Sequence, residues 1–143
     1  MTLADTNVWL ALAISGHQHF GAATSWFWKQ PTQSVAFCRA TQHSLMRLFT
    51  TRAVMEGYGS TPLSNRAAWQ VFDDLASHPT TTVLPEPPGT VDLWRELSNI
   101  ETASPKVWMD AYLAAFAIAS GCRLASTDRA FERFRGLDFE YLF

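Results

Sequence analysis

The chain has 143 residues, of which 48% are hydrophobic and 13% aromatic, which is ample for one packed core and predicts a single domain over residues 1–143. The formal net charge of -2 excludes a strongly basic surface, so any contact with nucleic acid must come from a local patch. No basic stretch followed by an apolar one opens the chain, and the longest apolar run contains Asp110. We therefore expect no signal peptide, no membrane span and a cytoplasmic location, with Cys38 and Cys122 as free thiols.

The first half of the chain alternates short strand candidates with helices. Its predicted elements are a strand at 2–4, helices at 6–14 and 19–29, a strand at 34–37 and a helix at 39–50. Asp5 separates the first strand from its helix and is a possible N-cap. In the last of these helices, the spacing places Gln42 on the same apolar side as Leu45 and Phe49. A loop containing Gly57 and two further turn residues is expected to follow.

The second half continues the same alternation. We expect a helix capped by Ser64, a strand at 81–84, a helix capped by Thr90 and running to about 101, a largely buried helix with Ser104 as N-cap and Gly121 at its end, a strand at 123–126, a short basic helix at 129–135 and an edge strand at 138–142. Strands that alternate with helices through short loops are typical of a three-layer α/β domain. The predicted fold is therefore a mainly parallel sheet of four to five strands flanked by helices.

Four polar residues from separate parts of the chain are predicted to meet at one edge of this sheet. Asp5 and Asp128 each follow a strand directly, and Gln42 and Asp110 lie in early turns of helices that start at the same edge. We place Asp110 beyond the first turn of its helix, where capping and dipole effects fade, so that its charge requires another partner. Asn7 can orient a neighbouring carboxylate, although local turn bonds are the simpler expectation for it, and the same holds for Thr127.

Three carboxylates in one crevice repel one another unless a cation lies between them. Oxygen ligands without His or Cys at useful spacing suit Mg²⁺, or Mn²⁺, better than zinc. We therefore expect Asp5, Asp110 and Asp128 to be metal ligands, with Gln42 beside them either as a ligand-side amide or as a buried hydrogen-bonding residue. A site of this kind can activate water for hydrolysis of a phosphodiester. The alternative for Asp5 and Asp128 is that they only cap helices.

Three segments of the sequence carry a joint pattern, LADTNVWL at 3–10, MDAYLAA at 109–115, and LASTDRAF at 124–131 followed by Arg133 and Phe134. In this order and in a chain of this length, they resemble the PIN domain, in particular the VapC toxins of bacterial toxin-antitoxin pairs. The resemblance implies a Mg²⁺-dependent endoribonuclease that cuts tRNA or ribosomal RNA. It also implies a homodimer silenced by a VapB-like antitoxin, with Asp5, Asp110 and Asp128 holding the metal.

The sequence departs from that family at its second acidic position, where the family usually has Glu and this chain has Gln42. Glu132, one turn after Asp128, is either a replacement or part of an exposed helix face. Two other functions therefore stay open: an RNA-binding or partner-binding module without catalysis, and an aspartate-nucleophile phosphatase built on Asp5. The second needs another acid two residues on, where Asn7 stands. Arginines that can contact RNA phosphates are Arg39, Arg47, Arg52, Arg129, Arg133 and Arg135.

Overall fold

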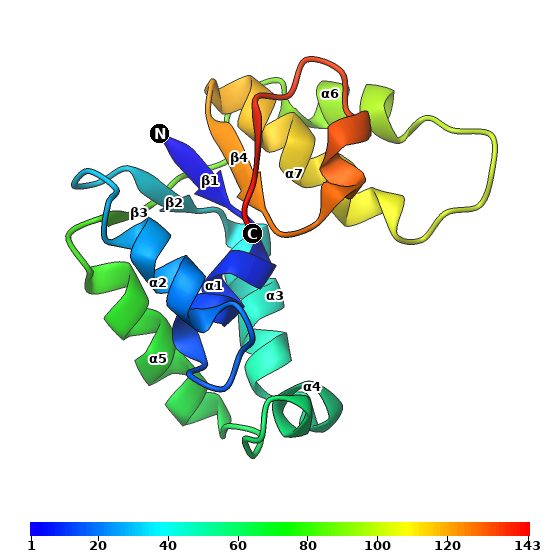
Figure 1. Ribbon diagram of the computed structural model, residues 1–143. Coiled ribbons are helices and arrows are strands. Elements are labelled where there is room, and N and C mark those ends of the chain that lie inside the picture. The colour runs from blue at the N-terminus through cyan, green and yellow to red at the C-terminus, as the bar shows by residue number, and fades with distance from the viewer.

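A computed structural model describes residues 1–143, and at its centre is a five-stranded sheet (Figure 1). The strand order is β3-β2-β1-β4-β5, and every neighbouring pair is parallel. The strands are β1 (Thr2–Ala4), β2 (Val35–Phe37), β3 (Thr81–Val83), β4 (Arg123–Ser126) and β5 (Phe139–Tyr141). The predicted α/β class with a parallel sheet is confirmed.

Helices cover both faces of the sheet. They are α1 (Thr6–Ala13), α2 (Phe20–Phe27), α3 (Arg39–Phe49), α4 (Arg52–Gly57), α5 (Asn65–Ser77), α6 (Thr90–Ser98), α7 (Val107–Ser120) and the 3₁₀ helix η1 (Arg129–Arg133). Helices α1 to α5 pack on one face and α6, α7 and η1 on the other, as Figure 1 shows. Successive strand residues alternate between the two cores, with Leu3 and Leu124 on the α7 side and Ala4 and Ala125 on the α1 side.

The Trp9 side chain fixes α1 against the sheet. Its ring is fully buried and stacks on Phe37 of β2, with centroids 3.7 Å apart and an interplanar angle of 10°. Its indole nitrogen donates to the carbonyl of Ala4 at 3.1 Å. Helix α1 is therefore tied to both β1 and β2 directly after the position of Asp5.

Two helix starts differ from the sequence prediction. Ser104 does not cap α7: its carbonyl accepts from Val107 in a preceding turn, and Lys106 takes the N-cap position without a side-chain bond. Asp110 consequently lies in the first turn of α7, and its predicted place beyond that turn was wrong. Likewise, Thr90 is the first residue of α6 rather than its cap, because Gly89 in the left-handed region (φ 85°) precedes it.

Helix α4 occupies a segment that the sequence predicted as a loop. Met55 is buried in the core on the α1 side, and Arg52 pairs with Glu56 one turn later at 2.9 Å. Four of the five residues before Gly57 are good helix formers, and the burial of Met55 adds to their preference. Helix α4 ends at Gly57, and the chain turns through Gly59.

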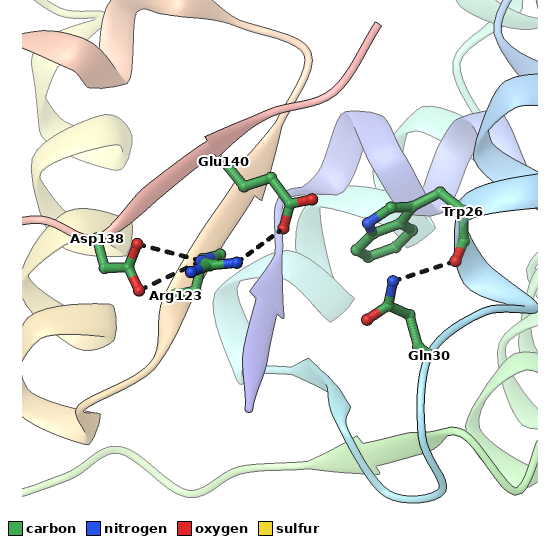
Figure 2. Close-up of polar contacts among 5 residues, drawn as sticks. All are labelled: Trp26, Gln30, Arg123, Asp138 and Glu140. Carbon is green, nitrogen blue, oxygen red and sulfur yellow. Dashed lines mark hydrogen bonds and ion pairs between the residues drawn. The ribbon is translucent and has the colours of Figure 1, made fainter.

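The last strand is tied to β4 by Arg123, whose guanidinium reaches Asp138 at 3.1 Å and Glu140 at 3.7 Å (Figure 2). In the same view, Gln30 donates to the carbonyl of Trp26 at 3.2 Å, next to the end of α2. Cys38 and Cys122 are both free and buried, as expected. None of the helices combines the length and the apolar character needed to cross a membrane.

Candidate active site

Strand β1 delivers Asp5 to the carboxyl edge of the sheet, where both of its side-chain oxygens are engaged. One accepts from the Thr6 backbone N–H at 2.6 Å, which makes Asp5 the N-cap of α1. The other accepts from the Ser126 hydroxyl at 2.7 Å. Burial, helped by the negative charges of Asp110 and Asp128, raises the pKa of Asp5 to about 6 against these two hydrogen bonds.

The fully buried Ser126 organises this edge. Besides donating to Asp5, its hydroxyl oxygen accepts from the Asn7 amide and from the Asp128 backbone N–H, both at 3.0 Å. The Asn7 carbonyl oxygen also faces the backbone N–H of Thr127 at 3.4 Å. Asn7 therefore bonds across the sheet edge rather than locally, and the expectation of turn bonds for Asn7 was wrong. A serine that closes a buried strand two residues before an aspartate was the available sequence signal for Ser126, and the sequence analysis missed it.

Asp128 begins the 3₁₀ helix η1. One of its oxygens accepts from the Ala130 backbone N–H at 2.8 Å, which is a capping bond of the kind that the sequence allowed. Glu132 of η1 pairs with Arg129 at 2.9 Å, and its side chain is half exposed. The structure thus favours the exposed-face interpretation of Glu132 over a replacement for the missing acid at position 42.

Asp110 has a partner that the sequence did not predict. The Arg133 guanidinium donates to one Asp110 oxygen at 3.0 Å, and the same guanidinium lies 4.9 Å from the ring centre of Phe134. Burial raises the pKa of Asp110, while Arg133 lowers it and Asp128 raises it. The two paired residues are 23 positions apart, on α7 and η1, so only the packing of η1 against α7 brings them together.

Gln42 is buried in the first turn of α3, and its side-chain oxygen accepts from the Arg39 guanidinium. Of the two interpretations left open, the structure therefore favours a hydrogen-bonded amide. Where the resemblance leads one to expect a carboxylate, this chain places a neutral amide next to a positive charge. Gln42 consequently adds no negative charge to the acidic edge.

The three carboxylates converge, as their effects on one another's pKa show, but they do not form a ready metal cluster. No three His, Cys, Asp or Glu side chains are close enough together to hold an ion in common. Each of two carboxylates has its own partners instead: Arg133 contacts one Asp110 oxygen, and Ser126 and Thr6 contact those of Asp5. Carboxylate oxygens that repel one another are nevertheless the type of ligand that a hard divalent cation prefers. Metal ligation by Asp5, Asp110 and Asp128 stays a prediction.

The parallel sheet in the order β3-β2-β1-β4-β5 and the acidic residues at its carboxyl edge are the features expected of a PIN-domain protein. The family model of the PIN domain matches residues 2–137, and the chain belongs to the PIN-domain family, within its VapC group. Its sequence is 45% identical over 144 residues to Ribonuclease VapC41 of Mycobacterium tuberculosis, covering 99% of each chain. Ribonuclease VapC31 of the same organism is 30% identical over 138 residues, covering 94% of this chain and 93% of that protein.

Solved structures share the fold at low sequence identity. The crystal structure of VapBC2 from Rickettsia felis, bound to a DNA fragment from its promoter, superimposes with a TM-score of 0.68 at 14% identity and covers 99% of this chain and 98% of that one. The expected resemblance to VapC proteins is thereby confirmed, and the predicted fold with it.

Proposed function

We propose that this chain is an endoribonuclease toxin that hydrolyses phosphodiester bonds of tRNA or ribosomal RNA with Mg²⁺. The observation that carries the proposal is the convergence of Asp5, Asp110 and Asp128 at the carboxyl edge of the sheet, with the pKa of Asp5 raised to about 6. VapC41, 45% identical along the whole chain, is named a ribonuclease, which supports the same activity here.

The residues that would hold Mg²⁺, or Mn²⁺ in its place, are Asp5, Asp110 and Asp128. The bound ion would orient and deprotonate water and stabilise charge on the phosphate. Ser126 and Thr6 hold the Asp5 carboxylate in one orientation, and the Ala130 N–H does the same for Asp128. Arg133 pairs with one Asp110 oxygen and so competes with a metal ion for that carboxylate, and a guanidinium displaced from it would be a cation for an RNA phosphate.

The hydrogen bonds of the site weigh against the phosphatase alternative. An aspartate-nucleophile phosphatase needs a second acid two residues after Asp5, and Asn7 at that position is an amide committed to Ser126. The non-catalytic alternative depends on Gln42, which is neutral and paired with Arg39. RNA cleavage assays distinguish this non-catalytic module from an enzyme.

RNA cleavage with and without metal tests the proposal. The purified chain is incubated with total tRNA and rRNA in Mg²⁺, in Mn²⁺ and in EDTA, and new RNA ends are mapped. Asp5→Asn, Asp110→Asn and Asp128→Asn should each abolish cleavage, whereas Asp74→Asn, an exposed carboxylate of α5, should cut as the parent does. Metal-dependent RNA binding without cleavage would instead support a non-catalytic module, and cleavage that persists in the Asn variants would remove the site assignment.

We also propose a VapB-like antitoxin as partner and a homodimer as the assembly. Expression of the chain alone should arrest growth, and co-expression of the product of the adjacent reading frame should relieve the arrest. Light scattering on the purified chain measures the oligomeric state, and a monomeric mass at micromolar concentration would refute the dimer.

A further inference from the structure

A groove of about 350 Å³ runs between α3 and α5. Its walls are formed by Arg39, Gln42, His43, Met46, Arg47 and Thr50 of the α3 side, and by Asn65, Ala68 and Trp69 of α5. Helix α3 starts directly after β2, the neighbour of the strand that ends at Asp5. One end of the groove therefore begins at the acidic edge of the sheet, at the hydrogen-bonded pair Arg39 and Gln42.

The groove is a local positive patch on a chain of net charge -2. Arg39, His43 and Arg47 are exposed along it, and none of its nine lining residues is Asp or Glu. Neither Arg39 nor Arg47 forms a salt bridge, whereas four other arginines do, namely Arg52, Arg123, Arg129 and Arg133. The guanidinium groups of this groove are thus not neutralised by carboxylates of the chain.

Trp69 adds a flat apolar surface beside these cations. Its side chain is 51% exposed although it is one of the largest in the chain. Phe72 packs against the indole in a T-shaped contact, with centroids 6.0 Å apart, which holds the ring in position one turn from the buried core. An exposed aromatic ring next to unpaired guanidiniums is the combination that binds single-stranded nucleic acid, through base stacking and phosphate contacts.

We infer that the α3–α5 groove binds a single-stranded segment of the RNA substrate, with phosphates on Arg39 and Arg47 and a base stacked on Trp69. The inference rests on the proposed ribonuclease function and specifies where the strand lies before it reaches the carboxylates. It also divides the arginines that the sequence analysis proposed for RNA contacts. Arg39 and Arg47 face the groove, whereas Arg52 and Arg129 form ion pairs within their own helices.

The larger groove of the molecule lacks these properties and provides a matched control. It lies between α6 and α7, has a volume of about 670 Å³, and presents Trp94, Ile100 and Trp108 with a single cation, Arg95. Its exposed tryptophan, Trp108, is on the opposite face of the sheet from Trp69. A polyanion gains little charge compensation there, so substitutions in this groove should leave RNA binding unchanged.

The test measures RNA binding separately from cleavage. All variants are made in the Asp5→Asn background, and binding of a short, fluorescently labelled single-stranded RNA is followed by anisotropy over a range of salt concentrations. Trp69→Leu should weaken binding by about fivefold or more, as loss of one stacked base does. Arg47→Gln should reduce the slope of log Kd against log salt by about 0.7, as expected for one lost phosphate contact on a single strand. Trp108→Leu and Arg95→Gln should change neither quantity.

The possible failures are distinguishable. The groove assignment is overturned if Trp69→Leu and Arg47→Gln bind RNA as the parent does, or if the Trp108 and Arg95 controls lose as much binding. Cleavage by the unsubstituted chain then leaves the proposed function standing. Weaker capture of the antitoxin with unchanged RNA binding would assign the groove to the protein partner and overturn the inference as well. Absence of any RNA cleavage by the unsubstituted chain removes the proposed function itself. Urea unfolding of each variant identifies losses caused by misfolding.

Discussion

Replacing Asp5 by Asn should remove the pH dependence that this residue gives to folding stability. The pKa of Asp5 rises from 3.8 to about 6 in the folded chain, with burial as the main cause. Below pH 3.8 the carboxyl group is protonated in both folded and unfolded states and contributes nothing. Between pH 3.8 and about 6 the unfolded chain loses this proton while the folded chain keeps it, so stability falls as the pH rises, and the loss is complete above pH 6.

The size of the effect follows from the two pKa values. At about 1.36 kcal/mol per pKa unit, the ionised Asp5 lowers the free energy of unfolding by about 3 kcal/mol above pH 6 when no cation is bound. Asn keeps the cap on Thr6 through its oxygen, but its NH2 group then faces Ser126 and cannot accept the serine proton. That NH2 group also finds no free acceptor there, because the serine oxygen already accepts from Asn7 and Asp128. That lost hydrogen bond costs about 1 kcal/mol. The net gain for Asp5→Asn is about 2 kcal/mol at neutral pH.

Urea unfolding in EDTA measures this difference directly. At about pH 7.5 the Asn variant should be more stable by about 2 kcal/mol, and at about pH 3.5 it should be less stable by about 1 kcal/mol, with a crossing between them. Asp74→Asn controls for the change in net charge. A stability difference that is the same at both pH values, or an Asn variant that is less stable at neutral pH, would refute the assignment of a strained carboxylate at position 5. Saturating Mg²⁺ should stabilise the parent and not the variant.

Three further changes test the surroundings of the site and the packing of the fold. Ser126→Ala leaves two donors without their acceptor and should cost about 1–3 kcal/mol of stability, while NMR titration should show a still higher pKa for the neighbouring buried carboxyl. Arg133→Gln removes the competitor for the α7 carboxylate and should tighten Mg²⁺ binding severalfold by calorimetry; unchanged affinity would mean that this carboxylate is no ligand. Away from the site, Gly16→Ala places a Cβ 2.3 Å from the Tyr58 carbonyl oxygen and should lower the free energy of unfolding by about 1–3 kcal/mol, measured with urea. Gly21→Ala, with open space around it, should be neutral or stabilising.

Much of the candidate site could be predicted because it depends on chain order alone. In a parallel sheet, every residue that directly follows a strand lies at the same edge, so the places of Asp5 and Asp128 follow from where the apolar strands end. Gln42 and Asp110 follow in the same way from the starts of the crossover helices. The same argument does not identify the residue that orients these carboxylates. Ser126 looks like any small strand residue until the orientation of its hydroxyl is known.

Local sequence also failed where packing decided the secondary structure. The glycines after Thr51 suggested a loop, yet the residues of α4 before Gly57 are mostly good helix formers and Met55 is buried. The turn through Ser104 delays the start of α7 to Val107. Helix propensities differ by tenths of a kcal/mol per residue, which is less than the burial of one methionine contributes.

By itself, the sequence determined the parallel α/β fold, the family and the identity of the carboxylates, because these depend on hydrophobic periodicity and on residues at strand ends. Only the tertiary structure decided which arginines have an acidic partner and which do not. It brings Arg133 to Asp110 across 23 residues, and it leaves Arg39 and Arg47 without an acidic partner beside an exposed Trp69. The physical reason is that a charge pair depends on distances of a few ångströms between side chains, and these distances are set by how helices pack rather than by their order along the chain.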